Sequence, residues 1–102
     1  MRVSEALQYL AETDEDYGRL KGYVAGLEYQ IKSAEATGFL EAQGTVGERQ
    51  AAARICEGYK TLIQKFEDNK IEMEIIGAKR QTAELTIKVW QSQNANKRAG
   101  NL

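Results

Sequence analysis

Residues 52–90 read AARICEGYKTLIQKFEDNKIEMEIIGAKRQTAELTIKVW, and this stretch decides the fold. Along it, one residue in every three or four falls on a single line, with spacings that alternate between 3 and 4. Ten of the twelve residues on this line, which we call the 52–90 seam, are apolar or aromatic. The seam consists of Ala52, Ile55, Tyr59, Leu62, Phe66, Asn69, Met73, Ile76, Arg80, Ala83, Ile87 and Trp90. This periodicity is typical of a long helix that packs along its whole length on another helix.

The first part of the chain repeats the same spacing in a line that we call the 3–34 seam. It consists of Val3, Ala6, Leu10, Thr13, Tyr17, Leu20, Val24, Leu27, Ile31 and Ala34. Within it, Thr13-Asp14-Glu15-Asp16 is typical of a helix N-cap followed by an acidic first turn. The segment is therefore either one helix over residues 3–42 or two collinear helices with a break near Thr13.

A turn between the two seams is expected at residues 43–45. Gly44 is a natural helix terminator, and Thr45-Val46-Gly47-Glu48 fits a capping box that starts a helix over residues 46–94. A short turn between two long helices favours antiparallel packing. The sequence thus predicts an all-α fold, a long antiparallel helical hairpin over residues 1–95 that resembles a coiled coil.

The register of this hairpin follows from the position of the turn. Folding about residue 44 places Tyr17 beside Ile71, Leu27 beside Thr61 and Leu10 beside Ala78.

Three polar residues, Thr13, Asn69 and Arg80, interrupt the two seams. A single polar residue at such a position usually sets register or orientation, so we interpret Asn69 and Arg80 as structural. In the expected register, Arg80 would reach Glu12 or Glu5.

A second apolar line, which we call the second stripe, lies on the side of the 71–89 helix away from the 52–90 seam. It consists of Ile71, Ile75, Ala78, Thr82, Leu85 and Val89, with spacings of 4, 3, 4, 3 and 4. A helix that is apolar on two faces has to be covered on both. Either part of the N-terminal segment folds back over this stripe, or a second chain covers it in a two-fold dimer with a four-helix arrangement.

We favour the homodimer, because the other faces of the N-terminal segment are polar. The expected dimer or partner interface consists of Ile71, Ile75, Ala78, Leu85 and Val89.

The composition argues against enzymatic chemistry. The chain has no histidine and a single cysteine, Cys56, which excludes Ser-His-Asp and Cys-His catalysis as well as histidine or multi-thiolate zinc sites. No phosphate-binding glycine motif occurs. We therefore expect no enzymatic activity, no cofactor and no bound metal.

The cellular location is also predicted from the sequence. The single cysteine fits a reducing compartment, and the sequence shows neither an apolar signal segment nor a membrane-spanning run. We expect a soluble cytoplasmic protein without a membrane partner.

The C-terminal end suggests an alternative partner. Residues 91–102 lose the apolar repeat, and residues 96–102 are expected to form a flexible tail. Residues 79–98 carry five basic residues against one acidic residue. Lys88, Trp90, Lys97 and Arg98 together could contact a phosphate backbone and stack on a base, which would make nucleic acid a partner.

Two stretches, GTVGER at residues 44–49 and AELTIKVWQSQNANKRAGN at residues 83–101, resemble small, largely uncharacterised helical proteins of tailed bacteriophages and prophages. The resemblance implies a virus-encoded helical protein made in the cytoplasm of a bacterial host, an accessory to DNA replication or recombination. It implies no catalytic or binding residues. The function we expect is that of a non-enzymatic interaction protein that scaffolds or modulates a partner protein.

Overall fold

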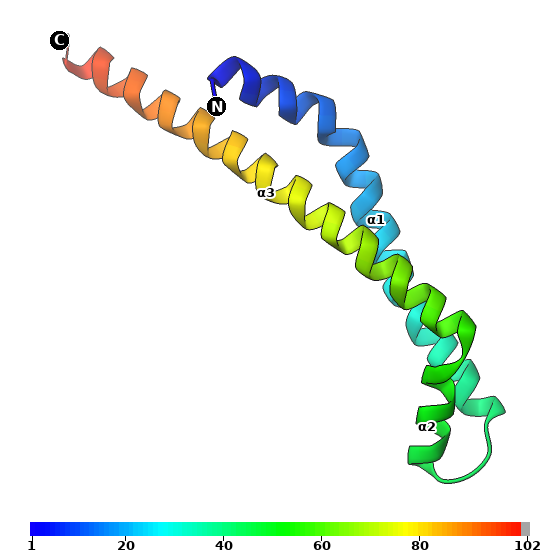
Figure 1. The fold of residues 1–102 in the computed structure, drawn as a ribbon. Coiled ribbons are helices and arrows are strands. Elements are labelled where there is room, and N and C mark those ends of the chain that lie inside the picture. The colour runs from blue at the N-terminus through cyan, green and yellow to red at the C-terminus, as the bar shows by residue number, and fades with distance from the viewer. Residues whose placement is uncertain (101–102) are drawn as a thin grey trace. The chain divides into compact units, whose positions relative to one another are not determined.

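The structure, a computed structural model, describes residues 1–100. Almost all of these residues are helical. Its three helices are α1 (Val3–Glu41), α2 (Val46–Ile55) and α3 (Glu57–Gly100) (Figure 1). No strand occurs in residues 1–100. The absence of proline from the sequence leaves every position free to be helical, and the all-α prediction is confirmed.

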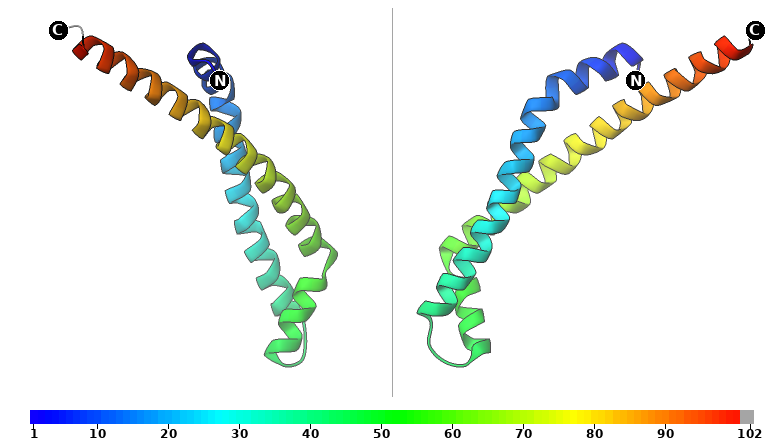
Figure 2. Two further views of the ribbon diagram at one scale, coloured as in Figure 1. Left: turned by 60° about the vertical axis from the view of Figure 1, so that its left-hand side comes forward. Right: turned by 180° about the vertical axis from the view of Figure 1, so that it is seen from behind.

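The helices form two compact units, each of which contains an antiparallel pair of segments from α1 and α3. Unit 1 combines Met1–Gly18 of the first segment with the part of α3 from Met73 onward, and unit 2 comprises Arg19–Glu72. In both units, the α1 segment runs antiparallel to the α3 segment (Figures 1 and 2). The predicted helical hairpin is therefore confirmed.

The N-terminal segment is one helix rather than two. α1 passes through Thr13 without a break, and the Thr13 hydroxyl donates to the Tyr9 carbonyl at 2.7 Å. A threonine that donates to the carbonyl four residues earlier sits inside a helix and does not cap one. Of the two alternatives, one continuous helix is correct.

Both seams form the interior of the hairpin. Every residue of the 3–34 seam is buried or half-buried, with Ala6, Val24 and Leu27 the most buried. The 52–90 seam behaves in the same way except at Ile55 and Trp90, which are 67% and 49% exposed. Among the described residues, Leu27 is the only large side chain that is fully buried, so the core of a single chain is thin.

The single helix expected over residues 46–94 is in fact two helices, which is a correction to the prediction. Cys56 separates α2 from α3 with φ −64° and ψ 140°, an extended conformation. α2 packs against the end of α1, and a methyl group added to Gly38 would lie 2.9 Å from the Cα and Cβ of Ala53. The break lets α2 turn so that Ala53 meets Gly38, and it leaves Ile55 in solvent.

The end of α3 also differs from the prediction. α3 continues to Gly100 instead of ending near residue 94, so the first residues of the expected tail, 96–100, are helical. Residues 101–102 lie outside the described part of the chain. Alanine and lysine are good helix formers, and no proline or β-branched residue occurs in residues 91–100 to oppose the helix.

The turn has the predicted capping chemistry. Gly44 has a φ of 115°, a left-handed conformation that favours glycine. Thr45 is the N-cap of α2, and its hydroxyl accepts from the Glu48 amide at 3.2 Å. The Glu48 carboxylate lies where a side chain on Gly44 would be, but this flexible side chain can move, so the positive φ is what favours glycine at this position.

The register of unit 1 differs from the expected one. A methyl group on Gly77 would lie 2.8 Å from the Tyr17 hydroxyl, so Tyr17 lies beside Gly77 and not beside Ile71. The shift arises because the turn is larger than expected: α2 and the extended Cys56 intervene between the two long helices.

Arg80 consequently does not reach Glu12 or Glu5. It donates to the Thr13 hydroxyl at 2.6 Å, to the Leu10 carbonyl at 3.1 Å and to the Asp14 carboxylate at 2.5 Å. Two of the three polar interruptions of the seams thus bind each other.

Candidate interaction surface

The second stripe is exposed along its whole length on α3. Ile71, Ile75, Leu85 and Val89 are between 51% and 60% exposed, and Ala78 and Thr82 are exposed as well. α1 packs on the 52–90 seam, which lies on nearly the opposite side of α3. The N-terminal segment therefore does not fold back over the stripe.

Threonine hydroxyls do not interrupt the apolar character of this surface. Thr82 donates to the Ala78 carbonyl at 3.2 Å, and Thr86 donates to the Thr82 carbonyl at 2.9 Å. Because each hydroxyl is bonded to its own helix, the γ-methyl groups remain for contact with a partner. The stripe is continuous and apolar from Ile75 to Val89.

A shallow hollow of about 430 Å³ lies at the C-terminal end of the stripe. It is lined by Met1, Thr82, Leu85, Thr86, Val89, Trp90 and Gln93. Thr82, Leu85, Thr86 and Val89 are spaced like the four residues that surround an inserted side chain in coiled-coil packing. The hollow is suited to one apolar side chain from a partner helix.

Sequence reasoning missed three of the lining residues, Met1, Thr86 and Gln93. Thr86 could have been found, because it lies four residues after Thr82 on the edge of the stripe. Met1 reaches the hollow only through the antiparallel fold.

The four residues expected to contact nucleic acid do not share one side of α3. Trp90 and Lys97 are seven residues apart and lie on the same side, with Arg98 next to them. Lys88 precedes Trp90 by two residues and lies on nearly the opposite side. Trp90 and Lys97 therefore share a side of α3, and Lys88 does not lie on that side.

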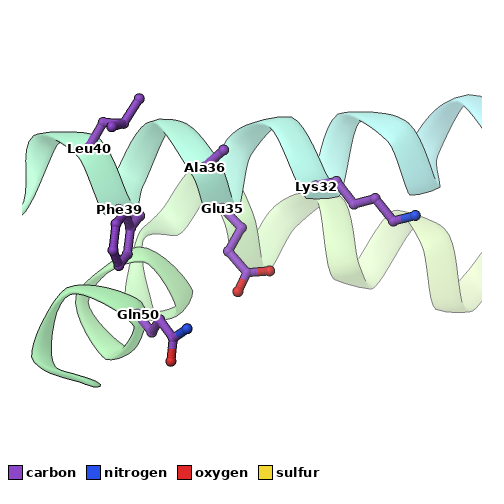
Figure 3. A pocket seen from close by; sticks show the side chains of 6 residues that line it. All are labelled: Lys32, Glu35, Ala36, Phe39, Leu40 and Gln50. Carbon is purple, nitrogen blue, oxygen red and sulfur yellow. The ribbon is translucent and has the colours of Figure 1, made fainter. Parts of the chain in front are cut away.

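A second hollow, of about 470 Å³, lies between the end of α1 and α2 (Figure 3). Phe39 points toward α2, while Leu40 points away from it. The Arg49 guanidinium stacks 4.2 Å from the centre of the Phe39 ring, and its Nε donates to the Phe39 carbonyl at 3.0 Å. Arg49 thereby satisfies a carbonyl at the C-terminal end of α1, so the contact is explained by helix capping.

Neither a metal cluster nor a membrane span is found in the described residues. No three His, Cys, Asp or Glu side chains of residues 1–100 come close enough to hold a metal ion. None of the helices over these residues has a stretch long and apolar enough to cross a membrane.

Comparisons of the chain with protein-family models, with curated proteins and with solved structures gave no match. The geometry of α3 is therefore the basis on which a function is inferred.

Proposed function

We propose that the chain is a non-enzymatic helical interaction protein that binds helices through the second stripe and so scaffolds or modulates a partner protein. The observation that supports this proposal is the exposure of the second stripe on an otherwise folded hairpin. Large apolar side chains at regular helical spacing gain free energy when a partner removes them from water. A contiguous apolar patch of this kind on a protein surface often marks a site of protein–protein interaction.

The origin and location of the protein are part of the same proposal. The likeness of residues 44–49 and 83–101 to small helical proteins of tailed phages supports a phage or prophage origin. The single cysteine supports a reducing compartment, which would be the cytoplasm of a bacterial host.

The proposal is tested with a matched pair of substitutions, Leu85→Glu and Leu7→Glu. Both leucines are 54% exposed, but only Leu85 belongs to the second stripe. Tagged wild-type protein produced in bacterial cells should retain a protein on affinity purification, either a second copy or another protein. We expect Leu85→Glu to reduce the retained amount at least tenfold and Leu7→Glu to leave it unchanged.

An equal set of retained proteins for the wild type and Leu85→Glu would contradict the proposal. Circular dichroism of both variants shows whether they remain helical, so a folding defect is recognised separately.

Binding of single-stranded nucleic acid is a second candidate function. It is favoured by Trp90, which is half-exposed and lies on the same side of α3 as Lys97. Fluorescence anisotropy with a labelled oligonucleotide at low salt should show binding that weakens with added salt. Lys97→Ala combined with Arg98→Ala should abolish it, whereas no binding by the wild type at low salt would remove this candidate.

A further inference from the structure

The second stripe has a pattern that is symmetric along α3. Its spacings of 4, 3, 4, 3 and 4 are the same when they are counted in either direction. Large side chains occupy both ends, and the small Ala78 and the threonine at position 82 occupy the middle. Two antiparallel copies with a two-fold axis level with residue 80 would place Ile71 opposite Val89, Ile75 opposite Leu85 and Ala78 opposite Thr82.

We propose that the occupant of the second stripe is a second copy of this chain, bound in antiparallel orientation about an axis level with residue 80. The inference rests on the proposed function, because it assumes that the stripe is an interaction surface. It adds the identity of the occupant, its direction and its register. The two copies of α3 form the centre, and each α1 packs on the outer side.

The hollow at the end of the stripe fits this register. Thr82, Leu85, Thr86 and Val89 surround a point level with residues 85 and 86 of α3. In the antiparallel dimer, that level is occupied by Ile75 of the second copy. Ile75 is itself 51% exposed, so it is available to insert. The two-fold axis repeats the contact, and each copy supplies one isoleucine and one hollow.

The charges beside the stripe are compatible with the antiparallel direction. Glu74 and Lys88 each precede a stripe residue by one position, so they flank the stripe on the same side. In the antiparallel dimer, Glu74 of one copy lies beside Lys88 of the other, and the axis repeats this pair. Lys79 lies beside its own equivalent near the axis, where its exposed ammonium group can extend into water.

Disulfide cross-linking tests the direction and the register. Cys56 is exposed and is the only cysteine, so it is first replaced by alanine. The test cysteines are then introduced into this Cys56→Ala background. Ile75→Cys and Leu85→Cys are made separately, then mixed, unfolded together, refolded and mildly oxidised. We expect a covalent dimer in the mixture and none with either variant alone.

The expected difference has a geometric reason. In the antiparallel dimer, Leu85 and its equivalent are ten residues apart along the axis, about 15 Å. Disulfides require Cα atoms within about 7 Å. Efficient cross-linking of Leu85→Cys with itself would show a parallel dimer and overturn the inference.

A second variant avoids loss of an apolar contact. Gln81 is exposed at the edge of the stripe and lies close to its own equivalent only in the antiparallel dimer. Gln81→Cys alone should therefore cross-link, and its failure to do so would contradict the register.

Sedimentation equilibrium of the wild-type protein separates this inference from the proposed function. A dimer at micromolar concentration is expected, and a monomer would overturn the inference. If the monomer still retains another protein that Leu85→Glu loses, the proposed function stands without self-association. If Leu85→Glu loses nothing that the wild type retains, the proposed function fails too.

Discussion

Arg80 of α3 makes polar contacts with the α1 segment of unit 1. Its side chain is 15% exposed and donates to Leu10, Thr13 and Asp14, and its guanidinium lies 5.2 Å from the centre of the Tyr17 ring. The sequence identified Arg80 and Thr13 as polar interruptions of their seams, but it assigned Arg80 the wrong partners. The partners depend on the register, and a shift of a few residues changes every polar pair.

Arg80→Ala should destabilise the protein by about 2–3 kcal/mol, because it leaves a part-buried threonine and a backbone carbonyl without their donor. Asp14→Asn should cost less than about 1 kcal/mol, because the Asp14 side chain is 65% exposed and water replaces the ion pair. Urea denaturation followed by circular dichroism measures both. Equal losses for the two variants would show that the ion pair, and not the part-buried hydrogen bonds, provides the stability.

Gly26 and Gly38 lie on the same helix, but substitution by alanine should have opposite effects on stability at the two positions. A methyl group on Gly38 would lie 2.9 Å from Ala53, whereas one on Gly26 would meet nothing within 4 Å. Gly38→Ala should destabilise the protein by about 1–3 kcal/mol through overpacking. Gly26→Ala should stabilise it by about 0.5–1 kcal/mol through helix propensity.

Thermal denaturation of the two alanine variants measures these effects. If the Gly38→Ala variant were as stable as the wild type, this result would contradict the close approach of α1 and α2 at Gly38 and Ala53.

At the scale of elements, the capping box and the break at Cys56 differ in how well the sequence predicts them. Thr45 and Glu48 have the residue types and spacing of a local motif, and the structure contains the Thr45–Glu48 bond that this motif predicts. The break at Cys56 has no such signal, because neither proline nor glycine occupies that position. The structure places it three residues from a tertiary contact, the packing of Ala53 on Gly38.

Thr45→Ala should destabilise α2 by about 1 kcal/mol, because the Glu48 amide loses its acceptor. Thr45→Ser keeps the hydroxyl and should retain most of the stability. Urea denaturation compares the three proteins. A loss for Thr45→Ser as large as that for Thr45→Ala would show that the methyl group, and not the hydroxyl, matters at this position.

At the scale of the whole molecule, the core of a single chain is thin, so the proposed dimer would add to its stability. Leu27 is the only large side chain among the described residues that is fully buried, while twelve large apolar side chains are about half exposed or more. When folded chains associate and unfolded chains do not, the melting temperature rises with the logarithm of the protein concentration.

The melting temperature of the wild-type protein should therefore rise with protein concentration. Leu85→Glu should lower the melting temperature and remove its dependence on concentration, whereas Leu7→Glu should retain both. Differential scanning calorimetry over a hundredfold range of concentration measures the effect. A melting temperature of the wild type that does not change over this range would contradict self-association.

The sequence by itself determined the two seams, the turn at Gly44 and the apolar second stripe. Each of these depends on a local period or motif, and helical spacing alone specifies which side chains share a face. The tertiary structure decided the register, the partners of Arg80, the break at Cys56 and the exposure of the second stripe. These depend on contacts between residues far apart in the chain. The period fixes which side of a helix is apolar, but not how far that helix slides along its neighbour or which of two apolar sides the neighbour leaves uncovered.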